Sequence, residues 1–169
     1  YRSLSGAAPG TLDYQLFIRA ATYMVSCLAD TFLEPSGVGG STPDGVEQYW
    51  EQQASRIAPG SDGLVVVPYW NGALTPYWDN RARGVMVGLT GAHGRAHVYR
   101  AILEGIAFEL RLCVEHAERA LDVPITEFVA MGGGARSPLW CQLLADVLQR
   151  PVVLAAEDEA TCLGAAMLA

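Results

Sequence analysis

A chain of 169 residues that is 51% hydrophobic is long enough to bury a core, which excludes a disordered or purely solvating protein. The 11 basic and 18 acidic side chains give a net charge of −7 with no run of Lys or Arg, which argues against a nucleic-acid partner. The sequence has no membrane-spanning apolar run and no signal-peptide layout, so we expect a single soluble, cytoplasmic α/β domain over residues 1–169.

The first half of the chain predicts two helices and one strand. Apolar residues recur at helical spacing over residues 12–33, and a second helical pattern, with Thr42 or Asp44 as its N-cap, continues to Ile57. The β-branched run LVVVPYW, residues 64–70, is typical of a strand buried on both faces of a sheet. The irregular loop NGALTPYWDNRARG and a short strand in VMVGL are expected to follow.

The clearest single element is a long helix over Arg95–Leu121, whose apolar side chains form one stripe. At about 1.5 Å per residue it should be about 40 Å long. Pro124 cannot continue the helix, so the helix ends in LDVP. Glu104 and Glu109 lie away from the stripe, and we expect both carboxylates to be solvated.

The last part of the chain predicts the order strand, glycine loop, helix, strand, helix. The expected elements are a strand over Glu127–Met131, a helix over Pro138–Leu148, a strand over Val152–Ala155 and a helix from about Glu159. Ser137 is the expected N-cap of the first of these helices, with proline at its first position. The free N–H groups and the positive dipole end of that helix would point back into the glycines, which lack a Cβ and let a phosphate or ribose approach. The sequence therefore predicts an anion site at this helix start.

Two other interpretations of the glycine loop stay open. The glycines can simply form a tight strand-to-helix corner, although three in a row exceed what a corner requires. The spacing of Gly132, Gly134 and Ser137 also half matches the dinucleotide fingerprint, and Glu157 and Asp158 follow where an acid would meet a ribose, as in an NAD-binding oxidoreductase. Serine in place of the third glycine speaks against this second alternative.

Three further groups of residues have two possible roles. His93 and His97 have the i, i+4 spacing of metal ligands, but no third ligand is in sight, so we interpret them as polar residues at the mouth of the long helix and expect no metal site. The aromatic residues Trp70, Tyr77 and Trp78 either fill the core or stack on a sugar. The four cysteines lie far apart in apolar settings without a CxxC pair, and we expect buried, reduced thiols at Cys27, Cys113, Cys141 and Cys162.

With these motifs in view, the chain resembles the C-terminal domain of the FGGY family of carbohydrate kinases. The segment GVMVGLTGAHGRAHVYRAILE, Gly84–Glu104, is similar to the second signature of that family along its whole length. NGALTPYWDNRARG, RAHVYRAILEGIAF, GGGARSPLWCQLLADVLQRPV and EATCLGAAMLA occur in the order of the family, and together they cover about Val65–Ala169. The resemblance implies a partial actin-like ATPase fold of the hexokinase, Hsp70 and ribonuclease H type.

The same resemblance implies ATP-dependent phosphorylation of a sugar or polyol hydroxyl, with Mg²⁺ on the phosphates. By resemblance, the nucleotide-binding residues are Gly132, Gly133, Gly134, Ala135 and Ser137, with Gly91 and Arg95 on the other side of the nucleotide. The family's catalytic aspartate and most of its sugar-binding residues match nothing in this sequence, and no residue here is assigned as the base. We expect this chain to be the larger part of a nucleotide-binding C-terminal domain that is inactive alone. Its partner would be an N-terminal kinase domain. The first residue, Tyr1, is not Met, which also favours a piece of a longer chain.

The substrate stays open between a pentulose such as xylulose and a glycerol-like polyol. NGALTPYWD is closer to glycerol kinases, whereas RAHVYRAILEGIAF and GGGARSPLW are closer to xylulokinases. A non-catalytic nucleotide-binding or interaction module is the alternative to an enzyme. An apolar patch facing the absent part would allow the isolated chain to associate into homo-oligomers.

Overall fold

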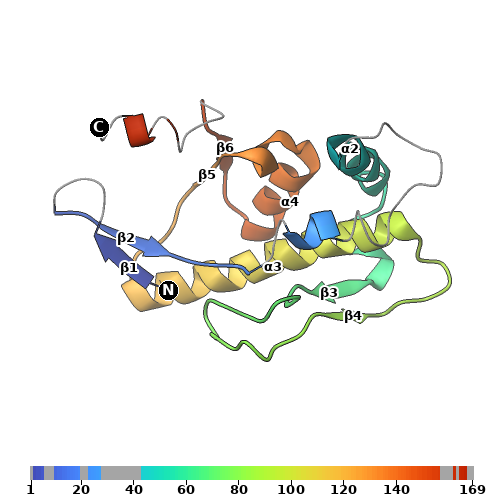
Figure 1. Ribbon diagram of the computed structural model, residues 1–169, viewed down its shortest axis with the longest axis horizontal. Helices are drawn as coiled ribbons and strands as arrows, with labels where there is room; N and C mark the ends of the chain where they lie inside the picture. Colours follow the sequence, from blue (N-terminus) through green and yellow to red (C-terminus); the bar gives the residue numbers. More distant parts are fainter. Residues whose placement is uncertain are drawn as a thin grey trace.

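The computed structural model describes residues 2–5, 10–19, 23–27, 43–156, 162 and 164–166. Helix α3 (Arg95–Leu121) is its central element, and helices α2 and α4 and strand β3 all pack against it (Figure 1). Its 27 residues have the predicted bounds, and Asp122 ends it in the left-handed conformation at φ 53° shortly before Pro124. Within the described residues, no helix is both long and apolar enough to cross a bilayer.

Two layers of secondary structure cover opposite sides of α3. Helices α2 (Pro43–Ala54) and α4 (Pro138–Leu148) lie on one side, and the antiparallel ribbon of β3 (Val65–Val67) and β4 (Val85–Val87) lies on the other (Figure 1). The ribbon comes very close to the helix at Gly105, where a Cβ would collide with the backbone oxygen of Val66. A residue without a side chain is therefore required at this contact.

The buried apolar side chains form two clusters along α3. The larger cluster joins α2, α3 and β3 and includes Trp50, Ala54, Val66, Ile102 and Ile106. The smaller cluster joins α3 to α4 and includes Ala107, Val114, Leu144 and Leu148. Because both clusters use the apolar stripe of α3, this helix fixes α2 and α4 relative to each other.

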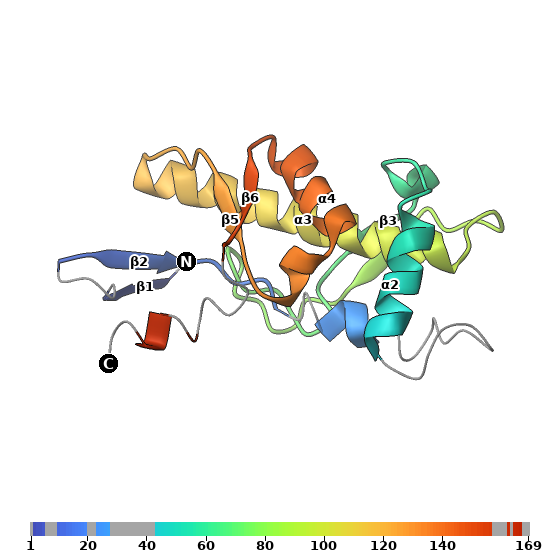
Figure 2. The same ribbon diagram turned by 90° about the horizontal axis from the view of Figure 1, so that it is seen from above.

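The C-terminal part forms the predicted β-α-β unit. Strand β5 (Phe128–Ala130) leads through the short 3₁₀ helix η2 (Gly133–Arg136) into α4, and β6 (Val152–Leu154) returns parallel to β5. Figure 2 shows β5 and β6 side by side next to α4. Of the last predicted helix, residues 162 and 164–166 are helical, and its other residues lie outside the described part.

Two predictions for the first half of the chain are corrected. Leu12–Gln15 is strand β2, which pairs with β1 (Arg2–Ser5) in an antiparallel ribbon, so the helix predicted from residue 12 is wrong there. Within the same predicted helix, residues 23–27 are helical, and residues 28–33 lie outside the described part. The second helix is confirmed, but it ends at Ala54 because a turn follows, in which the amide of Ile57 donates to the carbonyl of Ala54. Of its two proposed N-caps, Thr42 lies outside the described residues, and Asp44 lies inside the helix, which begins at Pro43.

The predicted strand over residues 64–70 is shorter and less buried than expected. It spans three residues, and Val65 is 51% exposed whereas Val66 is 2% exposed, because α3 covers only one face of the ribbon. Pro68, which has no N–H group, follows directly after the strand. The expectation of burial on both faces is therefore wrong for this chain.

Glu104 and Glu109 are buried rather than solvated, which corrects the prediction for both. The carboxylate of Glu104 accepts hydrogen bonds from the amide of Gly60 at 3.0 Å, from the hydroxyl of Ser61 at 2.9 Å and from Arg100 Nε at 2.7 Å. Glu109 Oε2 accepts a hydrogen bond from the hydroxyl of Tyr69 at 2.9 Å. Gly60, Ser61 and Tyr69 lie about 40 residues before the glutamates that they contact, and Arg100 lies one helical turn before Glu104. Together they supply the hydrogen bonds that a buried carboxylate requires.

All four cysteines are free thiols, but their burial differs. Cys113 is buried, Cys27 and Cys141 are half-buried, and Cys162 is exposed. The expectation of four buried thiols is thus correct for Cys113 and wrong for Cys162, which lies in the final helical segment at the surface.

Candidate nucleotide-binding site

The glycine corner between β5 and α4 is open rather than closed by its own chain. Gly132 has φ 75° and ψ −166°, a conformation that only glycine adopts readily. A Cβ built on Gly132 or Gly133 would meet nothing within 4 Å, and one on Gly134 would be in ordinary contact with the ring of Trp140. The backbone of this corner therefore needs glycine at one position and leaves space beside the next.

The start of α4 is capped as predicted. The hydroxyl oxygen of Ser137 accepts a hydrogen bond from the amide of Trp140 at 3.0 Å, and Pro138 occupies the first position of the helix. The anion site predicted at this helix start stays a prediction, and the structure adds that a carboxylate of the chain itself lies there. Glu51 Oε1 accepts hydrogen bonds from the amide of Leu139 at 3.1 Å and from the hydroxyl of Ser137 at 2.7 Å.

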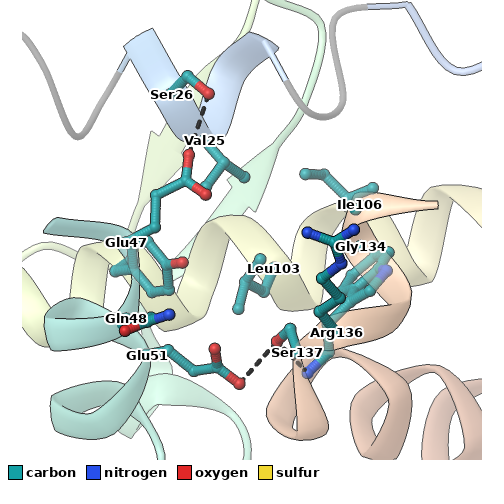
Figure 3. Close-up of a pocket in the computed structure, with 13 residues that line it drawn as sticks. Val25, Ser26, Glu47, Gln48, Glu51, Leu103, Ile106, Gly134, Arg136 and Ser137 are labelled. Carbon is teal, nitrogen blue, oxygen red and sulfur yellow. Dashed lines mark hydrogen bonds between the residues drawn. The ribbon is translucent and has the colours of Figure 1, made fainter. Parts of the chain in front are cut away.

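A pocket of about 430 Å³ opens beside this corner. Figure 3 shows side chains from α2, from α3 and from the glycine corner around one space. The lining residues are Val25, Ser26, Glu47, Gln48, Glu51, Tyr99, Leu103, Ile106, Gly133, Gly134, Arg136, Ser137 and Trp140. The pocket thus has an apolar floor on α3 and polar groups on two walls.

The carboxylates of α2 set the electrostatics of the pocket. Burial raises the pKa of the Tyr99 hydroxyl, and the charges of Glu47 and Glu51 raise it further. Burial also raises the pKa of the Cys141 thiol, again with a contribution from Glu51. Tyr99 and Cys141 therefore stay neutral at physiological pH, and Arg136 brings a positive charge to the opposite wall. An apolar floor, hydrogen-bond acceptors and one cation suit a flat ring with donor groups that is attached to an anionic tail.

The structure brings some of the predicted site residues together. Gly133, Gly134 and Ser137 line the pocket, and Gly132 and Ala135 belong to the same corner. Gly91 and Arg95 are exposed at the start of α3 and are not among the lining residues. The part of α3 that faces the pocket begins one turn later, at Tyr99.

Sequence reasoning missed the wall that α2 contributes. Glu47 and Glu51 are one helical turn apart, so they lie on the same face of α2 and both reach the pocket (Figure 3). That spacing was visible in the sequence beside the apolar stripe of α2. Arg136, between the glycines and the N-cap, was also missed.

The histidine pair has the polar role that the sequence interpretation gave it. His97 Nδ1 accepts a hydrogen bond from the amide of Gly94 at the start of α3, and its Nε2 lies 3.2 Å from a carboxylate oxygen of Asp62. His93 Nδ1 accepts a hydrogen bond from the amide of Thr90. In the described part of the chain, no group of three His, Cys, Asp or Glu side chains is arranged to hold a metal ion.

The aromatic residues of the loop after β3 divide between core and surface. Trp70 packs against the larger apolar cluster, and Tyr77 is exposed. Trp78 lines a second pocket of about 310 Å³ together with Phe17, Arg19, Leu74 and Asn80. Core filling is thus confirmed for Trp70, and stacking on a sugar stays a prediction for Trp78.

Comparison with known proteins decides the family. The model of the FGGY family of carbohydrate kinases, C-terminal domain, matches residues 18–169. The chain belongs to the FGGY family of carbohydrate kinases. It is 40% identical over 115 residues to a gluconokinase of Bacillus subtilis, and the match covers 68% of the chain and 22% of the gluconokinase. It is 40% identical over 118 residues to a glycerol kinase of Limosilactobacillus reuteri, covering 70% of the chain and 24% of that kinase.

Solved structures of FGGY kinases share the fold. Xylulose kinase from Rhodospirillum rubrum superposes with a TM-score of 0.70 at 32% identity, over 88% of this chain and 28% of that one. Glycerol kinase from Plasmodium falciparum, solved with ADP, gives a TM-score of 0.73 at 26% identity, over 88% of this chain and 28% of that one. The partial actin-like fold is therefore confirmed. The chain spans less than a quarter of the length of the curated relatives named above.

Proposed function

We propose that this chain is the larger part of the nucleotide-binding C-terminal domain of a kinase that phosphorylates a sugar or polyol with ATP. In this reaction a substrate hydroxyl gives its proton to a base beyond this chain, and its oxygen forms a bond to the γ-phosphorus. The bond from that phosphorus to the oxygen that bridges to the β-phosphate breaks, and ADP leaves. The observation that carries the proposal is the open glycine corner beside a pocket of about 430 Å³, in a chain of the FGGY family.

The residues of the pocket fit a nucleotide in a defined orientation. The apolar floor formed by Leu103 and Ile106 suits the flat base, and the carboxylate of Glu47 on α2 is an acceptor for its amino group. The open backbone at Gly132 and Gly133 leaves room for the ribose and phosphates, with Arg136 as a nearby positive charge. Gly91 and Arg95 stay proposals for the far end of the nucleotide, because they do not line this pocket.

The proposal leaves the chemistry of the transfer to other parts of the kinase. Mg²⁺ would be held mainly by the nucleotide phosphates and by residues outside this chain. The catalytic base and most of the sugar site would belong to segments beyond this chain, and the N-terminal kinase domain would be its partner. Phosphoryl transfer depends on a positioned nucleophile and on phosphates clamped by metal and cations, and closure of the two domains would bring these together.

The substrate class follows from the relatives. Similar proteins include a gluconokinase, glycerol kinases and xylulose kinases, so we propose a polyhydroxylated substrate such as a pentulose, glycerol or a sugar acid. The test is ATP-dependent phosphorylation by the protein as it is encoded, with any residues that flank this chain, across xylulose, glycerol and gluconate. Turnover of one of them above the others is the expected result, and turnover of none would contradict a kinase.

One substitution distinguishes a glycine corner that binds a nucleotide from one that is only a turn between strand and helix. Gly133→Ala adds a methyl group where the fold has open space, so the thermal midpoint should stay unchanged. If a nucleotide uses that space, its affinity should fall about tenfold, which corresponds to about 1.4 kcal/mol. Calorimetric titration with ATP and ADP measures this, and unchanged affinity in Gly133→Ala would favour the simple corner.

A second candidate is a non-catalytic nucleotide-binding module. It would use the same open glycine corner and the same pocket as the kinase. The two candidates differ in one assay, because a module binds ATP without consuming it in the presence of any of the three substrates.

The NAD-binding alternative has no structural support, since its two acids, Glu157 and Asp158, lie outside the described residues and the relatives named are kinases.

A further inference from the structure

Glu51 joins α2 to the start of α4 across the candidate nucleotide pocket. One oxygen of its carboxylate, Oε1, lies 2.7 Å from the hydroxyl of Ser137 and 3.1 Å from the amide nitrogen of Leu139. The two elements are 86 residues apart in sequence at this contact, and Figure 3 shows the bond to Ser137 spanning the edge of the pocket. Both donors point at the same carboxylate oxygen, so Glu51 is held in one orientation.

The physical effect of this contact is that of an anion at a helix N-terminus. The amides of the first turn have no partner within the helix and lie at the positive end of its dipole, so a carboxylate there is favourable. Hydrogen bonds to a charged acceptor are roughly twice as strong as bonds between neutral groups. Glu51 thus occupies the position that a bound phosphate would otherwise take at α4.

The contact extends from Glu51 into the glycine corner. Ser137 donates its hydroxyl proton to Glu51, accepts from the amide of Trp140 at 3.0 Å, and donates its own amide to the carbonyl of Gly134 at 3.2 Å. Ser137 therefore bonds to Glu51 through its side chain and to the last glycine of the corner through its backbone. Through this one residue the carboxylate on α2 fixes the backbone that faces the pocket.

Glu47 provides an internal comparison for this role. It lies one helical turn before Glu51, lines the same pocket and carries the same charge. Its Oε1 accepts a hydrogen bond from the hydroxyl of Ser26 at 3.1 Å, on the opposite side of the pocket from α4 (Figure 3). The difference that matters here is that the bonds of Glu51, unlike the bond of Glu47, reach the glycine corner.

We propose that Glu51 is a positioning residue of the nucleotide site: it closes the start of α4 to phosphate and fixes the glycine corner through Ser137. The proposal rests on the proposed nucleotide-binding function. In this role Glu51 directs the phosphates of the nucleotide to the open backbone at Gly132 and Gly133 rather than to the amide of Leu139.

The test compares four substitutions in the protein as encoded, by steady-state kinetics with ATP. Glu51→Ala should raise the KM for ATP about tenfold and leave kcat within about twofold, because it removes an interaction that holds ground state and transition state equally. Glu51→Gln keeps an acceptor oxygen and should bring the KM back to within about threefold of the unsubstituted protein. Glu47→Gln removes the same charge without touching α4 and should change the KM less than Glu51→Ala does. Gln52→Ala, at an exposed side chain of the same helix, is the control for substitution as such.

Three outcomes would overturn the role of Glu51. An unchanged KM in Glu51→Ala, a KM in Glu47→Gln raised as much as in Glu51→Ala, or a loss in kcat with constant KM would each do so. If Glu51→Ala does not fold, a double-mutant cycle of Glu51→Gln and Ser137→Ala replaces it. Effects on KM that are less than additive are expected, and additive effects would contradict the proposed link.

A second measurement separates this proposal from the proposed function. Hydrogen exchange at the amides of Leu139 and Trp140 should become faster in Glu51→Gln while the amides in the middle of α3 keep their rates. Faster exchange without any binding of ATP to the unsubstituted protein would support the contact of Glu51 with the start of α4. It would overturn the nucleotide site, and the positioning role with it. ATP binding that is equal in Glu51→Ala and in the unsubstituted protein would overturn the role of Glu51 alone.

Discussion

Glu109 is a carboxylate that the fold keeps away from water. It lies on α3 with 8% of its surface exposed and accepts a hydrogen bond from the hydroxyl of Tyr69 at 2.9 Å. Burial raises the pKa of Glu109 above its ordinary value of 4.5, and the bond from Tyr69 and the proximity of His116 only partly oppose the shift. The folded state therefore holds this proton to higher pH than the unfolded state does.

This shift makes the stability of the fold depend on pH. With a folded pKa above the unfolded one, Glu109 contributes stability that is fully present below about pH 4.5 and is lost as the pH rises through the folded pKa. Glu109→Gln does not titrate and can still accept from Tyr69. Its free energy of unfolding, relative to the unsubstituted chain, should therefore increase between pH 4 and pH 7. Urea unfolding at several pH values measures this, and a difference that is constant with pH would contradict it.

Gly132 and Gly133 are neighbours with opposite requirements. The backbone at Gly132, with φ 75° and ψ −166°, is strained for any other residue, so Gly132→Ala should cost about 1–3 kcal/mol of stability. Gly133 has room for a Cβ, so Gly133→Ala should change stability by less than about 0.5 kcal/mol. Chemical unfolding of both variants tests the pair. Equal losses would mean that the corner as a whole, rather than Gly132, requires glycine.

At the scale of elements, the sequence predicts best where local signals agree. The apolar stripe of α3 and the proline after it define Arg95–Leu121, and Ser137 with Pro138 defines the start of α4. The strand Leu12–Gln15 was missed because a four-residue strand depends on its partner, Arg2–Ser5, rather than on its own periodicity. Long-range partners also decide the burial of Glu104, whose bonds come from a turn at Gly60 and Ser61.

The candidate site divides in the same way. The glycine corner and its N-cap are local in sequence and were predicted from it. The opposite wall comes from α2, whose Glu51 lies 86 residues before Ser137, and no local pattern states that these two meet. The sequence could not show that a carboxylate of this distant element lies at the predicted phosphate site, and the phosphate site itself stays a prediction.

Gly105 controls the contact between α3 and β3. Gly105→Ala would raise helix propensity by about 1 kcal/mol, but its Cβ would collide with the backbone oxygen of Val66, and overpacking of this kind costs about 1–3 kcal/mol. Because backbone cannot move aside as a side chain does, we expect net destabilisation. The thermal midpoint measures it, with Gly91→Ala as the control, since a Cβ at Gly91 meets nothing within 4 Å. A midpoint for Gly105→Ala at or above that of the unsubstituted chain would contradict this contact.

At the scale of the whole molecule, the sheets formed by the described residues are narrow. The strands of the described residues form three separate two-stranded sheets. Each of the β3–β4 and β5–β6 sheets has large apolar side chains at the surface. On the first these are Val65, Val85, Met86 and Val87, and on the second Val129, Val153 and Leu154. Single exposed apolar residues are common, but paired ones on neighbouring strands, here Val65 with Val87 and Val129 with Val153, form apolar strips that are typical of surfaces covered by another part of a protein.

These strips predict the behaviour of the 169-residue chain on its own. Val87 is 57% exposed and Val153 is 46% exposed, and each lies in a sheet of two strands whose outer edges have no neighbouring strand among the described residues. Exposed apolar strand edges pair with other chains, so the isolated chain should associate as its concentration rises. Light scattering after size exclusion over a concentration series measures the mass. Val87→Lys and Val153→Lys should shift association to higher concentration, because a charged side chain on an edge opposes pairing. A single monomeric mass at every concentration would mean that the two strips do not drive contact between chains.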